Sequence, residues 1–589
     1  MIRKCSKKER GAIMKRMFHA LLVLVMFSVV VFHGPLGVAA SGTSTTPPIK
    51  VVVVSGTNYE MGVQYGEQAA ELIAVNRDVV WEILDTKVVD PNGAPLGRTV
   101  IEKDIDVWTY YQKKYDPGLT AWFVGISQGC KNKGFEVSYA DLVALMVYPQ
   151  EVWARPAMPY PPETGVVAAA PSKNSTLLAA ARTDIRPRSS CTAFAASGNA
   201  TQGYAPMVSI TGGAMLEVVN YVILVAFPTD GERFVSLTDA GRIANNVGMN
   251  SKYGWVMPAT VNAPWPPCAS SWGVTSEVYF HYLMQYPKSA KEAAEYLDKT
   301  PKGGVTGLFL FADHSGEAFI YEGGICGSAI RKPGDLGENK DFVVSTNHYN
   351  SPKMAPYNLP AEWFPDTYVR YATAFKKLSS AQPGTVGVDF AKALWATNDW
   401  YDASTGTWHT VPVPNDYSSV DPTNNTPYVC YVPGNLCEGG EYQIIQLPAQ
   451  KTAYLQLGVP QGTSIQYYWP DDPKPTGEYT KWQLLGSIEK VAGAASDDAW
   501  EMIDAAWDAF GHKARWLDPA TRKELMGLLN QATQAWWKGK MEEASAQKPD
   551  HGHQGDNKKT EMVLWSAALT DYATAQLDSQ MVTTKLNQY

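Results

Sequence analysis

The chain has 589 residues, of which 45% are hydrophobic and 18% charged, and its formal net charge is −8 at pH 7. This composition is globular, and the length suits one large domain with additions or two to three domains, so a mainly disordered chain is excluded. The acidic balance argues against nucleic acid as a partner, because proteins that bind nucleic acids neutralise phosphates with basic surfaces.

The N-terminus has the three parts of a secretory signal. A basic stretch over 3–16 precedes an apolar run over 20–32, and Val38-Ala39-Ala40 suits signal peptidase. The apolar run is shorter than the ~20 residues that span a bilayer, so we expect cleavage after Ala40 and no membrane span afterwards. Residues 1–40 carry seven basic residues and one acidic residue, so their removal changes the formal charge from −8 to −14. We therefore expect a secreted or periplasmic protein, or a lumenal one in a eukaryote.

Helical spacing of apolar residues marks the first part of the chain after the signal. It runs over 59–84 and again over 119–146, so we expect the segment 41–190 to be mostly helical. From Cys191 onward the pattern changes to short strands and hairpins, with groups of helices between them. We predict strands over 191–197, 207–210, 221–227, 234–237, 308–313, 317–321 and 342–346, and helices over 277–285, 290–298 and 368–378. This mixture predicts an α+β fold of layered sheets and helices over 191–470.

A proline-rich linker, Trp469–Pro475, interrupts this pattern. Beyond the linker the apolar spacing is helical over 498–514, 519–544 and 560–581, and a polar loop separates the last two segments. We therefore interpret the region 471–589 as a separate C-terminal helical appendage.

Six cysteines remain once the signal is removed, which is too few for a disulfide scaffold. Cys430 and Cys437 flank a turn-like segment and look like a local pair. The chain contains no Cys-x-x-Cys pair, no Gly-x-x-x-x-Gly-Lys phosphate loop, no Rossmann fingerprint and no metal-ligand triad. We therefore expect neither a metal nor another cofactor.

The segment Gly125-Ile-Ser-Gln-Gly129 fits the Gly-x-Ser-x-Gly pattern that exposes a nucleophilic serine in α/β-hydrolases. That serine needs a strand before it and a helix after it. Here the preceding Leu119, Trp122 and Ile126 follow helical spacing. We therefore favour small residues on a packed helix over Ser127 as a nucleophile.

Cys191 is the second candidate nucleophile. It stands at the start of a predicted strand, after a polar stretch that includes Arg188. Structural cysteines usually lie within elements or pair with another cysteine, so a lone cysteine in this place indicates a reactive thiol. A structural cysteine, as a thiol or in a disulfide, is the competing interpretation.

Five segments along the chain resemble a known family. Gly56–Gly66, Gly125–Gly129, Ser190–Thr192, Ala312–Glu317 and Ser345–His348 occur in the order seen in the acyl-coenzyme A:6-aminopenicillanic acid acyltransferase-like family. The resemblance covers residues 50–470, and the family is similar in its core to choloylglycine hydrolases. These are N-terminal-nucleophile (Ntn) hydrolases, so the resemblance implies a four-layer αββα Ntn core between the N-terminal helical segment and the C-terminal appendage.

The resemblance also implies a chemistry. In such enzymes the thiol cuts the bond before its own residue, here Ser190–Cys191, and the freed α-amine then serves as the base for the thiol. The resemblance implies that Asn347 and Asn262 donate to the oxyanion and that Arg370 lies near the thiol. The competing interpretations are asparagines that cap turns and a surface arginine.

One departure from the family concerns the acid that holds the new amine. The family has a carboxylate on the second strand, whereas this chain has Val208–Leu216 there, without an acidic residue. Thr211 or Ser209 would give a weaker hydrogen bond, and Glu217 would reach the amine only across a bulge at Gly212-Gly213.

Taken with the resemblance, the sequence predicts an exported cysteine hydrolase that cleaves a linear amide, such as an N-acyl compound or a small peptide. Transfer of the acyl group to an amine would use the same thioester on Cys191, so both reactions stay open. The expected partner is a small amide or acyl substrate. The alternatives are a phospholipase B-like lipid hydrolase and a catalytically inactive exported binding protein on the same scaffold.

Overall fold

A computed structural model describes most of the chain from residue 49 to residue 589. The residues within this range that it does not describe are 91–92, 157, 167–190, 213–219, 259–270, 304–306, 338–340, 359–360, 362–364, 398, 411–441, 458–477, 548–553 and 588. The predicted signal over 1–40 therefore lies outside the described residues. Within the described part of the chain, no helix combines the length and the apolar character that a membrane span requires.

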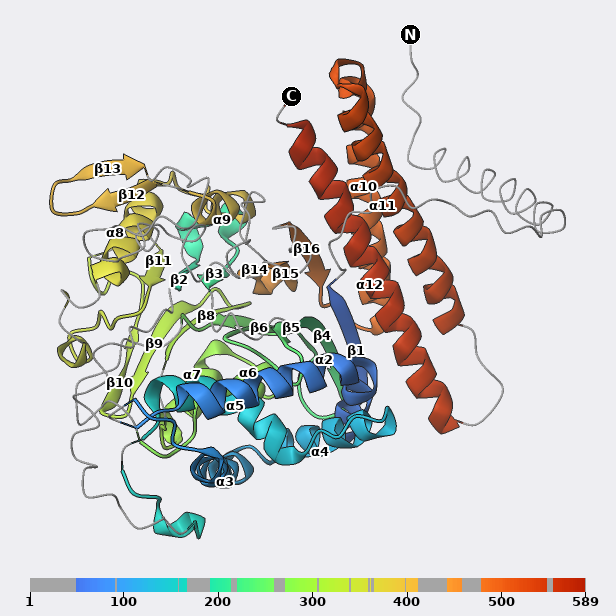
Figure 1. The fold of residues 1–589 in the computed structure, drawn as a ribbon. Helices are drawn as coiled ribbons and strands as arrows, with labels where there is room; N and C mark the ends of the chain where they lie inside the picture. Colours follow the sequence, from blue (N-terminus) through green and yellow to red (C-terminus); the bar gives the residue numbers. More distant parts are fainter. Residues whose placement is uncertain are drawn as a thin grey trace. The chain divides into compact units, whose positions relative to one another are not determined.

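The first described segment is a strand followed by four helices (Figure 1). These elements are β1 (Lys50–Gly56), α2 (Asn58–Lys87), α3 (Arg98–Tyr115), α4 (Pro117–Asn132) and α5 (Tyr139–Ala154). Capping boxes begin α2, at Thr57 and Glu60, and α5, at Ser138 and Asp141. The helix expected over 119–146 is divided into α4 and α5. The division falls where Gly134 takes φ +84°, a left-handed conformation that ends helices.

Two sheets contain most of the strands. The eight-stranded sheet has the order β1-β4-β5-β6-β7-β8-β9-β10, and the six-stranded sheet has the order β11-β2-β3-β14-β15-β16. Apart from β1, the strands of these two sheets are β2 (Thr192–Ala196), β3 (Met207–Gly212), β4 (Tyr221–Pro228), β5 (Phe234–Asp239), β6 (Val247–Asn250), β7 (Tyr253–Val256), β8 (Leu308–Asp313), β9 (Ala318–Gly324), β10 (Gly327–Arg331), β11 (Phe342–Ser345), β14 (Tyr442–Leu447), β15 (Thr452–Leu457) and β16 (Tyr479–Gln483). A separate hairpin pairs β12 (Asp399–Asp402) with β13 (Thr407–Thr410). The fold is therefore mixed, with several sheets and many helices.

The alternation of β1 explains how the eight-stranded sheet is buried on both faces. Val52 and Val54 pack with helices α2 to α7, which include α6 (Ser276–Gln285) and α7 (Ala290–Lys299). Val51 and Val53 belong to a different apolar cluster, together with side chains of the six-stranded sheet. The other face of the six-stranded sheet packs on α8 (Pro365–Ser380) and α9 (Val388–Trp395).

The C-terminal region is part of this core. It contributes strand β16 to the six-stranded sheet and then forms α10 (Ile488–Lys513), α11 (Pro519–Ala546) and α12 (Gln554–Leu586). Apolar residues of all three helices share the cluster that lies between the sheets, and Figure 1 shows the helices beside β1 and β16. The linker composition had indicated an appendage over 471–589, but these contacts make the region a structural part of the two-sheet unit.

Helix α12 covers one edge of each sheet, at β1 and at β16. At β1 it satisfies the backbone of Val51, which donates to Thr570 Oγ1 (3.2 Å) and accepts from Ser566 Oγ. At β16 the Lys481 backbone N donates to Gln576 Oε1 (2.9 Å), and Gln580 Nε2 donates to the Tyr479 carbonyl (2.6 Å). Unpaired strand edges invite association with other chains, so α12 replaces a missing strand at each edge.

Candidate active site

Cys191 directly precedes β2, in the interior of the six-stranded sheet. The register pairs Ala193 with Ser345 of β11, and Thr192 with Thr211 of β3. The same registers, continued by one or two residues, align Cys191 with Asn347 on one side and with Gly212 on the other. Gly212 is in turn the partner of Tyr442 on β14. Four positions that are distant in the sequence therefore form one row across the end of the sheet.

Three of the predicted site residues meet at Cys191. Its backbone N donates to Asn347 Oδ1 (3.3 Å), and its carbonyl accepts from Arg370 Nη1. Arg370 Nη2 also donates to Asn347 Oδ1 (2.6 Å), and its Nη1 reaches Thr192 Oγ1 (3.2 Å). Cys191, Asn347 and Arg370 are each at most 1% exposed. Arg370 is therefore a buried group that fixes the backbone of Cys191 and the amide of Asn347.

The first turns of α8 explain this convergence. Thr367 and Arg370 are three residues apart, so they lie on the same face of the helix. Thr367 Oγ1 accepts from the Asn347 backbone N (2.8 Å), and the Thr367 carbonyl accepts from Thr346 Oγ1 (2.9 Å). One helix face thus holds both the backbone and the side chain of Asn347.

His348 lies next to Asn347 but is a poor base. Burial, followed by the nearby Arg370 guanidinium, lowers the pKa of His348 to about 3. Its ring stacks on Tyr368 with 4.0 Å between ring centroids, and its Nδ1 and Nε2 contact Thr367 Oγ1 (2.9 Å) and Asn350 Oδ1 (3.1 Å). With so low a pKa, the imidazole is neutral at physiological pH and is too weak a base to take up the proton of a thiol efficiently.

Tyr442 and Gly212 also lie at the site, although no sequence pattern had pointed to Tyr442 or to this role of Gly212. A Cβ at Gly212 would lie 2.8 Å from the Tyr442 hydroxyl and 3.0 Å from Cys191 Sγ. The hydroxyl also donates to Asn246 Oδ1, which comes from the loop before β6. Gly212-Gly213 indicated a bulge, but a glycine in a strand also marks a close approach, and that signal would have identified the contact.

Several predicted residues lie outside the described part of the chain. Asn262 is one of them, as are Ser190, Glu217 and the pair Cys430 and Cys437. The structure consequently leaves the second oxyanion donor and the bond before Cys191 undescribed. Among the described cysteines, Cys130 and Cys191 are buried thiols, and Cys326 is in a disulfide that the sequence had not indicated.

Ser127 is inside α4 and is not at a strand-to-helix turn. Its hydroxyl donates to the Val137 carbonyl (2.6 Å). The glycines on either side serve helix packing, because a Cβ at Gly125 or Gly129 would collide with the backbone of α2. The Gly-x-Ser-x-Gly pattern therefore reflects the contact between α2 and α4, as the helical spacing had indicated.

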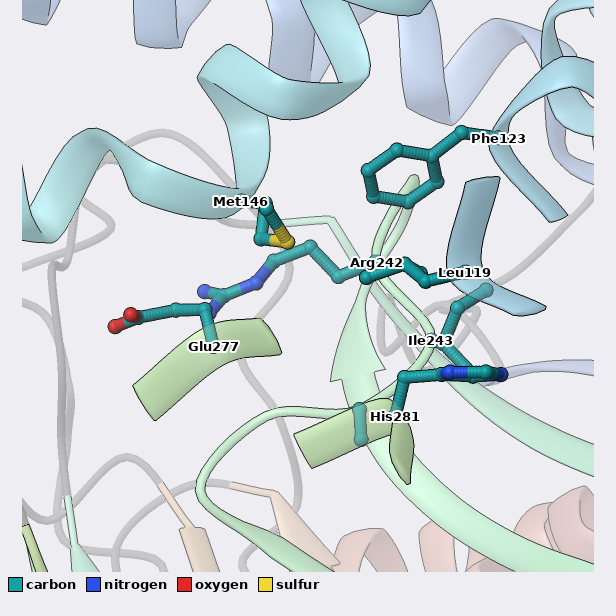
Figure 2. Close-up of a pocket in the computed structure, with 8 residues that line it drawn as sticks. Leu119, Phe123, Met146, Arg242, Ile243, Glu277 and His281 are labelled. Carbon is teal, nitrogen blue, oxygen red and sulfur yellow. The ribbon is translucent and has the colours of Figure 1, made fainter. Parts of the chain in front are cut away.

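A different pocket lies between the N-terminal helices and the segment after β5 (Figure 2). Its lining residues are Leu119, Phe123, Met146, Arg242, Ile243, Ala244, Glu277 and His281. Arg242 pairs with Asp239 at 3.0 Å, and His281 Nδ1 lies 2.6 Å from Asp116 Oδ2. The described residues of this lining include no cysteine, serine or threonine, so we do not assign nucleophilic chemistry to them. Among the described residues, no cluster of three or more histidine, cysteine or acidic side chains is arranged to hold a metal ion.

Comparison with known proteins does not assign a family. No family model matches this chain, and no curated protein matches it either. Two solved structures of conjugated bile acid hydrolase variants from Clostridium perfringens are similar to it at 13% and 9% sequence identity. Each match covers 46% of this chain, with 83% and 81% of the hydrolase, and both have a TM-score of 0.18.

Proposed function

We propose that this chain is a cysteine Ntn hydrolase that frees Cys191 by self-cleavage and then cleaves a linear amide through a thioester. The observation that carries the proposal is the hydrogen bond from the Cys191 backbone N to Asn347 Oδ1 (3.3 Å), beside a buried thiol. After cleavage that nitrogen would be the α-amine, and a side-chain acceptor would already face it.

This contact provides a hydrogen-bond acceptor for the α-amine, which the second strand does not provide because it has no acidic residue. Arg370 can only donate hydrogen bonds, so the Asn347 atom that faces its Nη2 is the amide oxygen. The same oxygen is within reach of the Cys191 nitrogen. We therefore assign to Asn347 Oδ1 the task of orienting the α-amine, and to Asn347 Nδ2 a donor role toward the oxyanion.

Self-cleavage would use the thiol of Cys191 on the carbonyl of Ser190. The S–C bond forms as the peptide C–N bond breaks, and the departing nitrogen takes the proton to become the α-amine. Water then hydrolyses the thioester, which leaves a carboxylate on Ser190 and restores the thiol. An α-amine has an ordinary pKa of ~8, so it can accept the thiol proton near neutral pH.

Turnover would repeat this chemistry on a bound amide. The α-amine takes the thiol proton, the thiolate attacks the carbonyl, and donors stabilise the tetrahedral oxyanion. Collapse expels the amine, which leaves with the proton from the α-ammonium group. Water then releases the acid, or a second amine takes the acyl group, so hydrolysis and acyl transfer differ only in the last nucleophile.

The proposal extends to the fold and the compartment. The pairing of two sheets with helices against their outer faces supports the four-layer αββα Ntn core. The disulfide at Cys326 supports export, because disulfides persist mainly in oxidising compartments. The substrate class is a small linear amide, such as an N-acyl compound.

The test is amide hydrolysis by the purified protein on a panel of N-acyl amino acids and small peptides. Cys191→Ala should lose ~1,000-fold or more in kcat/KM, because it removes the nucleophile. Cys130→Ala is the matched control, because Cys130 is the other buried thiol among the described cysteines and should be dispensable. Equal activity of the two variants would refute the assignment. Release of fatty acid from phospholipid instead would favour the lipid hydrolase, and ligand retention without turnover would favour the binding protein.

A further inference from the structure

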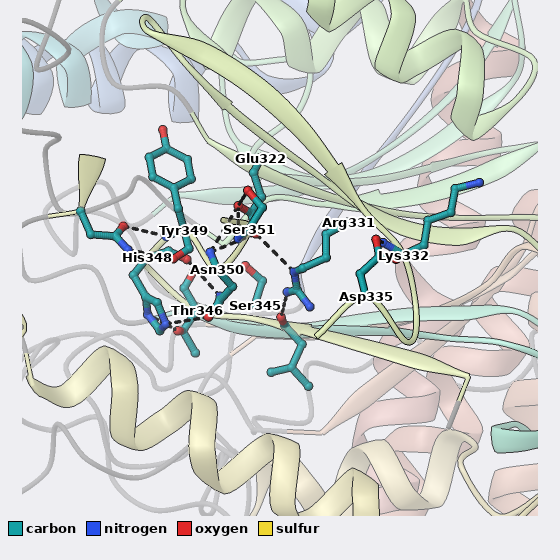
Figure 3. A network of polar contacts seen from close by, with 12 residues as sticks. Glu322, Arg331, Lys332, Asp335, Ser345, Thr346, His348, Tyr349, Asn350 and Ser351 are labelled. Atoms are coloured by element: carbon teal, nitrogen blue, oxygen red, sulfur yellow. Dashed lines mark hydrogen bonds and ion pairs between the residues drawn. The ribbon is translucent and has the colours of Figure 1, made fainter. Parts of the chain in front are cut away.

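Glu322 is a fully buried carboxylate in the middle of β9 and lies outside the proposed catalytic group. Its oxygens accept hydrogen bonds from the backbone N of Asn350 (3.1 Å) and from Ser351, through both backbone N (2.9 Å) and Oγ (2.7 Å). Both acceptor oxygens are thus used to hold the segment that follows Asn347 (Figure 3).

Arg331 holds the segment that precedes Asn347. It lies on β10, next to β9, and its Nε contacts Glu322 Oε1 at 3.3 Å. Its Nη2 donates to the carbonyl of Val344, in β11. Glu322 and Arg331 are each at most 1% exposed, so the ion pair is buried.

The ion pair connects the two sheets. β9 and β10 belong to the eight-stranded sheet, whereas β11 is the edge strand of the six-stranded sheet that pairs with β2. Asn347 lies between the two anchored points, Val344 and Asn350. Its backbone is held from a third direction by Thr367 of α8.

We propose that Glu322 and Arg331 are positioning residues that set the place of Asn347 relative to Cys191. This inference rests on the proposed function, since it assigns the pair to the geometry of that site. A catalytic group is effective only when its support fixes it to within about 0.5 Å. The ion pair lies within the eight-stranded sheet, and its hydrogen bonds reach the six-stranded sheet and the segment after it. It supplies this support because those bonds fix both ends of the segment that carries Asn347.

The effect of breaking the pair follows from its contacts. Glu322→Gln keeps the size of the side chain but replaces one acceptor oxygen by an amide donor. In place of Oε1 the amide faces Arg331 Nε and the Asn350 backbone N, and in place of Oε2 it faces the Ser351 backbone N. At least one hydrogen bond of the network is lost in either orientation, so its hold on the segment weakens. Asn347 itself is untouched, so substrate binding should change less than the chemical step.

The kinetic test compares Glu322→Gln with Asp104→Asn in the full chain. Asp104 is a buried carboxylate paired with Arg155 at 2.6 Å in the N-terminal helices, so it controls for the loss of a buried ion pair. We expect Glu322→Gln to lower kcat tenfold or more with KM within twofold, and to slow the appearance of the Cys191 terminus. Asp104→Asn should lower the melting temperature about as much as Glu322→Gln does, but should leave kcat unchanged. Wild-type kcat in Glu322→Gln, or an equal loss in Asp104→Asn, would overturn the positioning role.

Amide hydrogen exchange separates this inference from the proposed function. Glu322→Gln should speed exchange at Asn350 and Ser351 at least tenfold, while β2 and α8 stay as protected as in the wild type. Unchanged exchange at these two amides would overturn the positioning role of Glu322 and Arg331, even in an active enzyme. A wild type that neither cleaves itself nor hydrolyses an amide would instead remove the proposed function, whatever the exchange result.

Discussion

Cys191 and Cys130 are both buried thiols, but their surroundings differ. Cys130 lies between α4 and α2, where its Sγ is 3.8 Å from the Gly66 carbonyl, and burial raises its pKa to about 12. Cys191 has Arg370 and the Asn347 amide against its backbone. A thiol kept in its protonated form by burial is chemically inert, so the surroundings of Cys130 suit packing, whereas the polar groups beside Cys191 are the ones that the proposed mechanism needs.

Gly212 tests the geometry around the Cys191 thiol. Gly212→Ala adds a Cβ 2.8 Å from the Tyr442 hydroxyl and 3.0 Å from Cys191 Sγ, so one of them has to move. We expect turnover to fall at least tenfold, with a loss of about 1–3 kcal/mol in the free energy of unfolding, as for other overpacked cores. Gly527→Ala in α11, where a Cβ meets open space, is the control. Full activity in Gly212→Ala would place the reactive atoms elsewhere.

The lowered pKa of His348 predicts that the stability of the protein depends on pH. Burial lowers its pKa to about 3 in the folded protein, against an ordinary value near 6.5 in the unfolded chain. The unfolded state therefore binds the proton first, and stability that is present above pH 6.5 is lost as the pH falls toward 3. We expect urea unfolding to show that the free energy of unfolding decreases as the pH is lowered. The decrease should be steeper in the wild type than in His348→Gln, by up to ~1.4 kcal/mol per pH unit. Parallel slopes for the two proteins would contradict this.

Many of the strands and helices could be predicted from the regular spacing of apolar residues in the sequence. β8 and β11 begin at the residues predicted from the sequence, Leu308 and Phe342, because short continuous apolar runs mark strands that are buried on both faces. The valine run of β1 was missed. Such a run is itself typical of a buried strand, so β1 was predictable. Its pairing with β4, about 170 residues away, was not, because parallel pairing over such a distance leaves no local signal.

The candidate site was only partly accessible from the sequence. The resemblance pointed to Cys191, Asn347 and Arg370, and the structure brings these three together. Their spacing depends on the register of β11 against β2 and on the face of α8 that carries Thr367 and Arg370, which no local pattern encodes. Tyr442 escaped notice for the same reason, since it reaches the site through its pairing with Gly212.

At the scale of the whole chain, the C-terminal helices close the two-sheet unit. Truncation near Asp472 would remove β16 and α12 and leave the edges of β1 and β15 exposed. Exposed edges and an uncovered apolar cluster favour association, so we expect the truncated protein to aggregate on expression. Size-exclusion chromatography of residues 41–471 against 41–589 checks this. A soluble, monomeric truncated protein would support an independent appendage instead.

End-group sequencing with intact-mass measurement shows whether Cys191 becomes an N-terminal nucleophile. After incubation at neutral pH, the wild type should give two chains, one ending at Ser190 and one beginning Cys-Thr-Ala-Phe at Cys191. Cys191→Ala should stay as one chain, because the attacking thiol is absent. A wild-type chain that stays intact under these conditions, with no terminus at Cys191, would contradict the account.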